Sequence, residues 1–115
     1  MKFCVSGSRT IKDYHLIKAI LDGITQAYDV SYICAGGAVG VDKLVEQYAL
    51  ENNIKFEEFP ADWDTYHSAA GVIRNMKMVD WTHKTVAIWD GKSKGTKSAI
   101  DYANRVKKLL FVYEV

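Results

Sequence analysis

The chain has 115 residues, of which 49% are hydrophobic and 25% are charged, and this balance is that of a globular protein rather than a disordered one. Fifteen basic and 14 acidic side chains give a net charge of +1, without the basic excess expected of a non-specific nucleic-acid or membrane-surface binder. The length fits one domain over residues 1–115. Neither a signal peptide nor an apolar membrane-spanning run is apparent, so a cytoplasmic protein with no membrane partner is expected.

The first half of the chain alternates between short apolar stretches and amphipathic segments. Residues 2–6 are predicted to form a strand, and residues 13–28 a helix in which apolar side chains recur every three or four positions. These apolar positions are Leu16, Ile17, Ile20, Leu21 and Ile24. A second strand at residues 31–35 leads into a helix over residues 41–51, and a third strand follows at residues 54–59.

The second half repeats the alternation. A turn leads into a helix over residues 65–81, in which Gly71 is a weak point because glycine disfavours a helix interior. A strand at residues 85–89, a helix over residues 96–106 and a strand at residues 109–113 complete the chain.

Strands that alternate with helices are joined by crossover connections, and these place neighbouring strands parallel. The sequence therefore predicts an α/β fold, a Rossmann-like three-layer sandwich with helices on both faces of a five-stranded parallel sheet. If the chain starts in the middle of the sheet and reverses direction once, the strand order is 3-2-1-4-5. The loops after the first and fourth strands would then flank a crevice at the carboxyl edge of the sheet, where ligands bind in such folds.

The first of these loops contains Gly7, Ser8 and Arg9. It offers backbone amides, a hydroxyl group and a guanidinium group that can bind a phosphate with two hydrogen bonds. The alternative is a plain turn from strand to helix with Arg9 on the surface.

A second glycine-rich loop follows the second strand and contains Gly36, Gly37 and Gly40. Glycines let a ligand approach the backbone, but they can also serve backbone geometry alone. The loop lacks the GxGxxG pattern, which disfavours a conventional dinucleotide site. Asp42 lies near the start of the following helix, and helix stabilisation is its expected role.

The third loop follows the fourth strand and contains Asp90, Gly91, Ser93, Gly95 and Thr96. Its spacing does not match the GxxxxGK[ST] pattern, so ATP hydrolysis of the P-loop type is not expected. Free amides at the start of the next helix make a phosphate cradle the favoured interpretation. The alternative is a solvated helix cap.

Arg74 and Asn75 interrupt an otherwise apolar helix. The pattern alone favours an arginine that is solvated or paired with an acid. Trp63, Tyr66 and Trp89 could stack on a base, although aromatic side chains at strand ends more often belong to the core or its rim.

No metal site is expected, because His15, His67 and His83 share no ligand spacing with one another or with the cysteines. Cys4 and Cys34 lie in predicted apolar strands and are expected to be buried free thiols in a reducing compartment.

Five short motifs are spread along the chain: Gly7-Ser8-Arg9-Thr10, Gly36-Gly37-Ala38-x-Gly40-Val41-Asp42, Ala61-Asp62-Trp63, Ala70-Gly71-x-x-Arg74-Asn75-x-x-Met78 and Gly95-Thr96-Lys97. Together they resemble the YspA-like, YpsA-related branch of the SLOG superfamily. The resemblance implies a compact Rossmann-like domain that binds nucleotides or molecules derived from them. It also raises the expectation that Arg74 faces the crevice.

Relatives in this superfamily include DNA-processing protein A and the LOG phosphoribohydrolases. The LOG enzymes carry a catalytic glutamate three residues after the threonine of a Gly-Thr pair that matches Gly95 and Thr96. Here Ala99 stands at that position, so the resemblance implies phosphate binding without the obvious catalyst. Asp90 or Asp42 could take its place, and the catalytic residue stays unassigned.

The expected function is therefore binding of a small-molecule nucleotide ligand, as a sensor, carrier or viral sponge, with no cofactor. The alternative is a phosphoribohydrolase that cleaves the N-glycosidic bond of nucleoside monophosphates. Single-stranded nucleic-acid binding is a weaker alternative, because the near-neutral charge disfavours it. Since LOG enzymes are dimers, the resemblance leaves self-association open, and it leaves a cellular or a phage origin open too.

Overall fold

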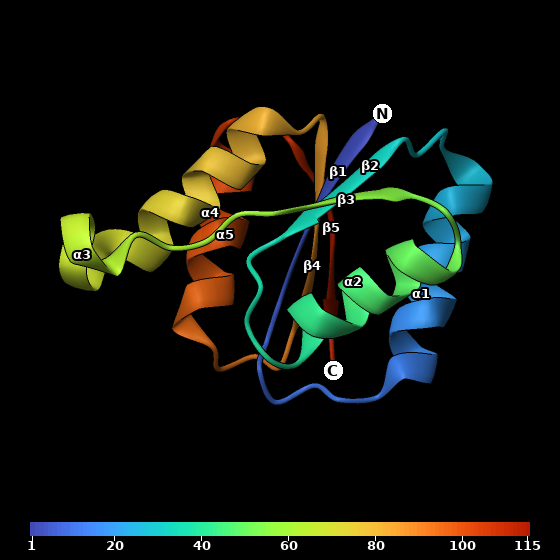
Figure 1. The fold of residues 1–115 in the computed structure, drawn as a ribbon, viewed down its shortest axis with the longest axis horizontal. Coiled ribbons are helices and arrows are strands. Elements are labelled where there is room, and N and C mark those ends of the chain that lie inside the picture. Colours follow the sequence, from blue (N-terminus) through green and yellow to red (C-terminus); the bar gives the residue numbers. More distant parts are fainter.

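The chain folds into alternating strands and helices, and the computed structural model describes all residues, 1–115 (Figure 1). The strands are β1 (Lys2–Gly7), β2 (Tyr32–Ala35), β3 (Lys55–Glu58), β4 (Lys84–Trp89) and β5 (Leu109–Glu114). The helices are α1 (Tyr14–Ala27), α2 (Val41–Glu51), α3 (Trp63–Tyr66), α4 (Ala70–Trp81) and α5 (Lys94–Arg105), with a short 3-10 turn, η1 (His67–Ala69), before α4. Every predicted strand is present, and no strand end differs from the prediction by more than one residue.

The strands form one parallel sheet in the order β3-β2-β1-β4-β5. The predicted fold class and strand order are thus confirmed. In the centre of the sheet, β1 pairs with β4 so that Gly7 lies opposite Ile88. The carboxyl ends of these two strands therefore lie side by side, and the segments that leave them start from the same edge.

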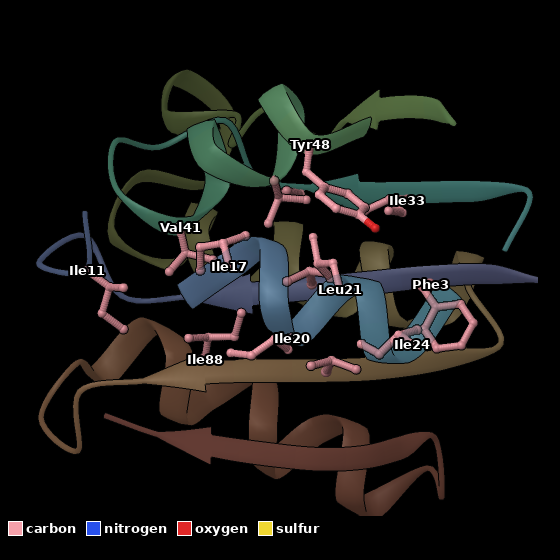
Figure 2. Close-up of a cluster of buried hydrophobic side chains, with 14 residues drawn as sticks. Phe3, Ile11, Ile17, Ile20, Leu21, Ile24, Ile33, Val41, Tyr48 and Ile88 are labelled. Carbon is pink, nitrogen blue, oxygen red and sulfur yellow. The ribbon is translucent and has the colours of Figure 1, made fainter. Parts of the chain in front are cut away.

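Helices cover both faces of the sheet, with α1 and α2 on one side and α4 and α5 on the other (Figure 1). The larger core cluster fills the space between the sheet and α1 and α2 (Figure 2). The buried residues of α1 are Ile17, Ile20, Leu21 and Ile24. Burial of each such side chain stabilises the fold by about 1.5–3 kcal/mol, so the spacing read from the sequence determines which face of α1 packs on the sheet.

A smaller cluster lies between the sheet and the helices α4 and α5. It consists of Cys4, Cys34, Met78, Val79 and Ala103. Both cysteines are buried and free, and they are direct neighbours on β1 and β2. The small side chains of Ala99 and Ala103, both fully buried, let α5 approach the sheet closely.

The predicted helix over residues 65–81 is wrong in its first part. The Asp62 side chain caps α3 by accepting a hydrogen bond from the Thr65 amide at 3.2 Å, and the α-helix then ends at Tyr66. His67 has φ 51° and ψ −128°, outside the helical region, so the helix cannot continue through it. The interruption is therefore at His67, whereas Gly71, the predicted weak point, lies within α4.

Candidate ligand-binding site

A cavity of about 500 Å³ opens at the carboxyl edge of the sheet, beside the ends of β1 and β4. This volume lies within the range of about 300–1,000 Å³ that is typical of small-molecule sites. The predicted site residues that line it are Gly7, Arg9, Arg74, Asn75, Asp90, Ser93, Gly95 and Thr96. The other lining residues are Ser6, Thr10, Ala38, Asp42, Met78 and Lys92. Segments far apart in the chain thus meet at the edge where a site was expected.

Arg74 is half-buried on α4, and neutral groups hold its guanidinium group. Its Nη1 donates to the backbone oxygen of Gly36 at 2.9 Å and to that of Phe59 at 3.4 Å, and its Nε donates to Asn75 Oδ1 at 2.9 Å. A Cβ atom at Gly36 would overlap the guanidinium group, so this glycine is needed for the close approach. Since no carboxylate oxygen lies within 4.0 Å, the positive charge of Arg74 has no ion-pair partner.

Asn75 is buried beside Arg74 and ties α4 to the start of α5. Its Nδ2 donates to the Gly95 oxygen at 3.1 Å and to Ser98 Oγ at 3.2 Å, while its Oδ1 accepts from Arg74. Asn75 therefore holds the first turn of α5 against the arginine, which fixes two walls of the cavity relative to each other.

Arg9 follows β1 and brings a second guanidinium group to the cavity. Its backbone packs against Gly40, where φ is 79° and where an added Cβ would lie 2.6 Å from the Arg9 oxygen. Gly40 thus serves the packing of two loops. Arg9, like Arg74, forms no ion pair. Two guanidinium groups without acidic partners on one cavity are well suited to bind an anion.

Asp42 lies in the first turn of α2 and also lines the cavity. Its side chain is buried, with the residue 7% exposed, and its Oδ2 accepts a hydrogen bond from the Ala38 amide at 3.1 Å. Burial raises its pKa to about 6, against the opposing effects of the Ala38 amide and of the positive charges of Arg74 and Arg9. We call Arg9, Asp42 and Arg74 the charged trio.

Sequence reasoning identified Asp42 only in part, since an acid in the first turn of a helix is explained by the helix dipole alone. The stronger signal is its place directly after a glycine-rich loop at the carboxyl edge of the sheet. Asp42 can stabilise the start of α2 and also border the cavity. Its Oδ2 accepts the amide of Ala38 in the preceding loop, and the residue lies in the cavity wall.

The loop between β4 and α5 is bonded to its own side chains. Asp90 Oδ1 accepts from the amides of Lys92 and Ser93, each at 2.8 Å, and its Oδ2 accepts from Thr10 Oγ1 at 2.7 Å. The Ser93 amide, then Thr10 and then the Lys92 amide lower the pKa of Asp90 to about 2. A carboxylate of the chain itself therefore occupies the amide of Ser93, one of the residues predicted to hold a phosphate.

The start of α5 leaves two amides free. Ser93 is the N-cap, so α5 begins at Lys94, two residues before the predicted start, and the Ser93 side chain accepts from the Thr96 amide at 3.4 Å. The amides of Lys94 and Gly95 have no hydrogen-bond partner, as is usual in a first helical turn. Of the two residues, Gly95 lines the cavity, so its amide is the one that remains available to an anion there.

The remaining predicted site residues do not line the cavity. They are Ser8, Gly36, Gly37, Gly40 and Gly91. Ser8 is fully buried, and its Oγ accepts from the Asp90 amide at 3.1 Å, so it joins the ends of β1 and β4. Gly37 and Gly91 have φ near 80° and serve the backbone turns. Ligand contact at all of these positions stays a prediction.

The aromatic side chains considered for base stacking also lie outside the lining, and they are Trp63, Tyr66 and Trp89. Trp89 Nε1 donates to the Ser93 oxygen at 3.0 Å, which braces the loop before α5.

No cluster of three or more His, Cys, Asp or Glu side chains is arranged to hold a metal ion. None of the helices combines the length and apolar character needed to cross a membrane.

Comparison with known proteins gives one family. The family model described as "YspA, cpYpsA-related SLOG family" matches residues 1–66. The matched part includes Arg9, the glycine-rich loop and Asp42, while Arg74 and the start of α5 follow it in the chain. Searches of curated proteins and of solved structures found no match.

Proposed function

Because the chain belongs to the YspA, cpYpsA-related SLOG family, we propose that its cavity binds a nucleotide or a nucleotide-derived ligand through a phosphate group. Membership of this family is consistent with a nucleotide-related function. Arg74 and Arg9 bind phosphate oxygens in this proposal, and the free amide of Gly95 completes the anion site. Asn75 keeps Arg74 in place.

One observation carries the proposal. Two guanidinium groups border a cavity of about 500 Å³, and neither has a carboxylate within 4.0 Å. A partly buried arginine without a partner is costly, because its charge loses water without gaining a counter-charge. An anionic ligand removes this cost, and the positive first turn of α5 adds to the attraction.

A thermal-shift screen tests the proposal, with AMP, ADP-ribose, cyclic ADP-ribose and cyclic dinucleotides as probes. A ligand at about 100 times its dissociation constant stabilises the folded state by roughly 2.7 kcal/mol, which raises Tm by on the order of 10 °C in a domain of this size. Mass spectrometry of the purified protein would reveal any nucleotide that stays bound. If no probe raises Tm and no nucleotide co-purifies, the proposal fails.

Hydrolysis of the N-glycosidic bond is a second candidate, favoured by one observation. Asp42 is a buried carboxyl group in the cavity wall, and its pKa of about 6 suits a group that exchanges protons near neutral pH. Ala99, at the position of the LOG glutamate, is fully buried against the sheet and does not line the cavity. Incubation with AMP, followed by chromatography for free adenine and ribose 5-phosphate, separates an enzyme from a binder.

A further inference from the structure

The Asp42 carboxylate is buried in the cavity wall, and its donors within the protein are backbone amides. Oδ2 accepts the Ala38 amide at 3.1 Å, and the Gly36 amide makes a weaker contribution to the hydrogen bonding of the carboxyl group. Arg9 and Arg74 border the same cavity but form no ion pair with it. A buried carboxylate usually has its oxygens bonded, because burial of an unpaired charge is unfavourable. A carboxylate offers about four lone-pair positions, so Asp42, with backbone amides as its protein donors, can accept a further hydrogen bond from a group in the cavity.

The identity of that donor follows from the charges around it. A phosphate would be attracted to the arginines and the first turn of α5, but the Asp42 carboxylate repels it. The group that faces Asp42 must instead be an uncharged donor on the same ligand. Hydroxyl groups of a sugar are donors of this kind, and they are attached close to the phosphate in every ribonucleotide.

We infer that Asp42 accepts a hydrogen bond from a sugar hydroxyl of the ligand, so that the site prefers ribose phosphates to deoxyribose phosphates. The inference rests on the proposed function and adds to it the ligand group that Asp42 recognises. In this arrangement the two arginines bind the phosphate of the ligand, while Asp42 accepts a hydrogen bond from a hydroxyl group of its sugar. The cavity volume of about 500 Å³ leaves room for both parts of a nucleotide.

Calorimetric titration at about pH 8, where Asp42 is ionised, tests the inference. The probes are AMP against 2′-deoxy-AMP and 3′-deoxy-AMP, and ribose 5-phosphate against 2-deoxyribose 5-phosphate. A hydrogen bond to a charged acceptor predicts that the ribose form binds roughly 10-fold or more tightly than at least one deoxy form. Equal affinities in the unaltered protein would overturn the inference without any variant.

Asp42→Asn provides the second arm, because it is nearly identical in shape. The Asn oxygen can still accept the Ala38 amide, and its NH2 group then replaces the other carboxylate oxygen by a donor. The preference for ribose should fall to about 1-fold in this variant. Asp29→Asn makes the same chemical change outside the lining of this cavity and should leave the preference intact. If the preference for ribose survives Asp42→Asn, another group of the protein causes that preference, and the inference is overturned.

The outcomes also separate the two proposals. If other nucleotides raise Tm but none of these probes binds, the proposed function survives and the role of Asp42 is rejected. If no nucleotide binds at all, both are rejected.

Discussion

The loop at residues 90–96 and the charged trio border the same cavity, but they differ in how completely their polar groups are bonded. In the loop, Asp90 and Ser93 accept three backbone amides of residues 92–96, and Thr10 donates to Asp90. In the trio, no member forms an ion pair. The comparison teaches that a glycine-rich loop can use its polar groups to hold itself together, while the charged groups that the fold leaves without ion pairs are the ones we expect to contact a ligand.

Two aspartates make the same contrast chemically. Hydrogen bonds from the Ser93 amide, Thr10 and the Lys92 amide lower the pKa of Asp90 to about 2, whereas burial raises the pKa of Asp42 to about 6. Asp90 is thus stabilised as an anion by its own loop. Asp42 would gain most from a new donor, which a ligand can provide.

The largest expected effect is that of Arg74→Ala on affinity for whichever nucleotide raises Tm. Loss of the guanidinium group should weaken binding roughly 30-fold to 1000-fold, because a hydrogen-bonded charge pair in a partly dry site is removed. Arg105→Ala is the control. It removes one positive charge at the C-terminal end of α5, outside the cavity lining, and should change affinity by less than about 2-fold. Calorimetric titration of both variants compares their affinities for the ligand. Equal losses of affinity would mean that the overall charge of the protein, not the cavity, binds the ligand.

Asp42→Asn should stabilise the ligand-free protein, and by an amount that depends on pH. The folded-state pKa of Asp42, about 6, lies above the ordinary value of 3.8, so the protonated form favours folding. Its contribution is complete below the ordinary value and is lost as pH rises to about 6. The variant should therefore gain up to about 3 kcal/mol relative to the unaltered protein at about pH 8 and little at about pH 4. Urea denaturation at both pH values would show this, and a difference that does not change with pH would contradict it.

Gly36→Ala tests whether the position of Arg74 matters as well as its presence. The added methyl group overlaps the guanidinium group, so Arg74 must shift and lose its bond to the residue 36 oxygen. We expect a loss of about 1–3 kcal/mol in stability and of about 10-fold in affinity.

Gly23→Ala is the matched control for this change, since nothing lies within 4 Å of an added Cβ in the middle of α1. It should raise stability by about 0.5–1 kcal/mol and leave affinity unchanged. Unaltered ligand binding in Gly36→Ala, measured by the same titration, would show that Arg74 does not need its present position.

The smallest expected effect on affinity is that of Asp90→Ala. The amides of Lys92 and Ser93 lose their acceptor, so hydrogen exchange at these two amides should become faster. Affinity should change by less than about 5-fold, because Asp90 is bonded within the loop and contributes no unpaired group. Exchange mass spectrometry and titration measure the two effects separately. A loss of affinity as large as that of Arg74→Ala would reverse the comparison between loop and trio.

The fold could be predicted because its determinants are periodic in the sequence. The spacing of Ile17, Ile20, Leu21 and Ile24 gives the buried face of α1, and the alternation of strands and helices gives a parallel sheet. The crossover rules then place the ends of β1 and β4 together, so the edge that carries the cavity could be predicted too.

The remaining features depend on side-chain directions that no periodicity encodes. An aspartate after a strand can point to solvent or turn back on its loop, and Asp90 turns back. His67 interrupts a helix with a positive φ that histidine rarely adopts, so the break at this residue could not be predicted from the sequence. The pattern around Arg74 favoured solvent or an acidic partner, because the carbonyl groups that hold it come from distant residues.

The use of uncharged carbonyl oxygens to hold Arg74 has a practical consequence for experiments at different ionic strength. Added salt screens exposed charges over about 8 Å at physiological concentration, but it has little effect on hydrogen bonds to neutral acceptors. The guanidinium group of Arg74 should therefore keep its place in concentrated salt, while the attraction exerted by the exposed Arg9 declines. Affinity that persists at high salt would then measure what Arg74 contributes by direct contact.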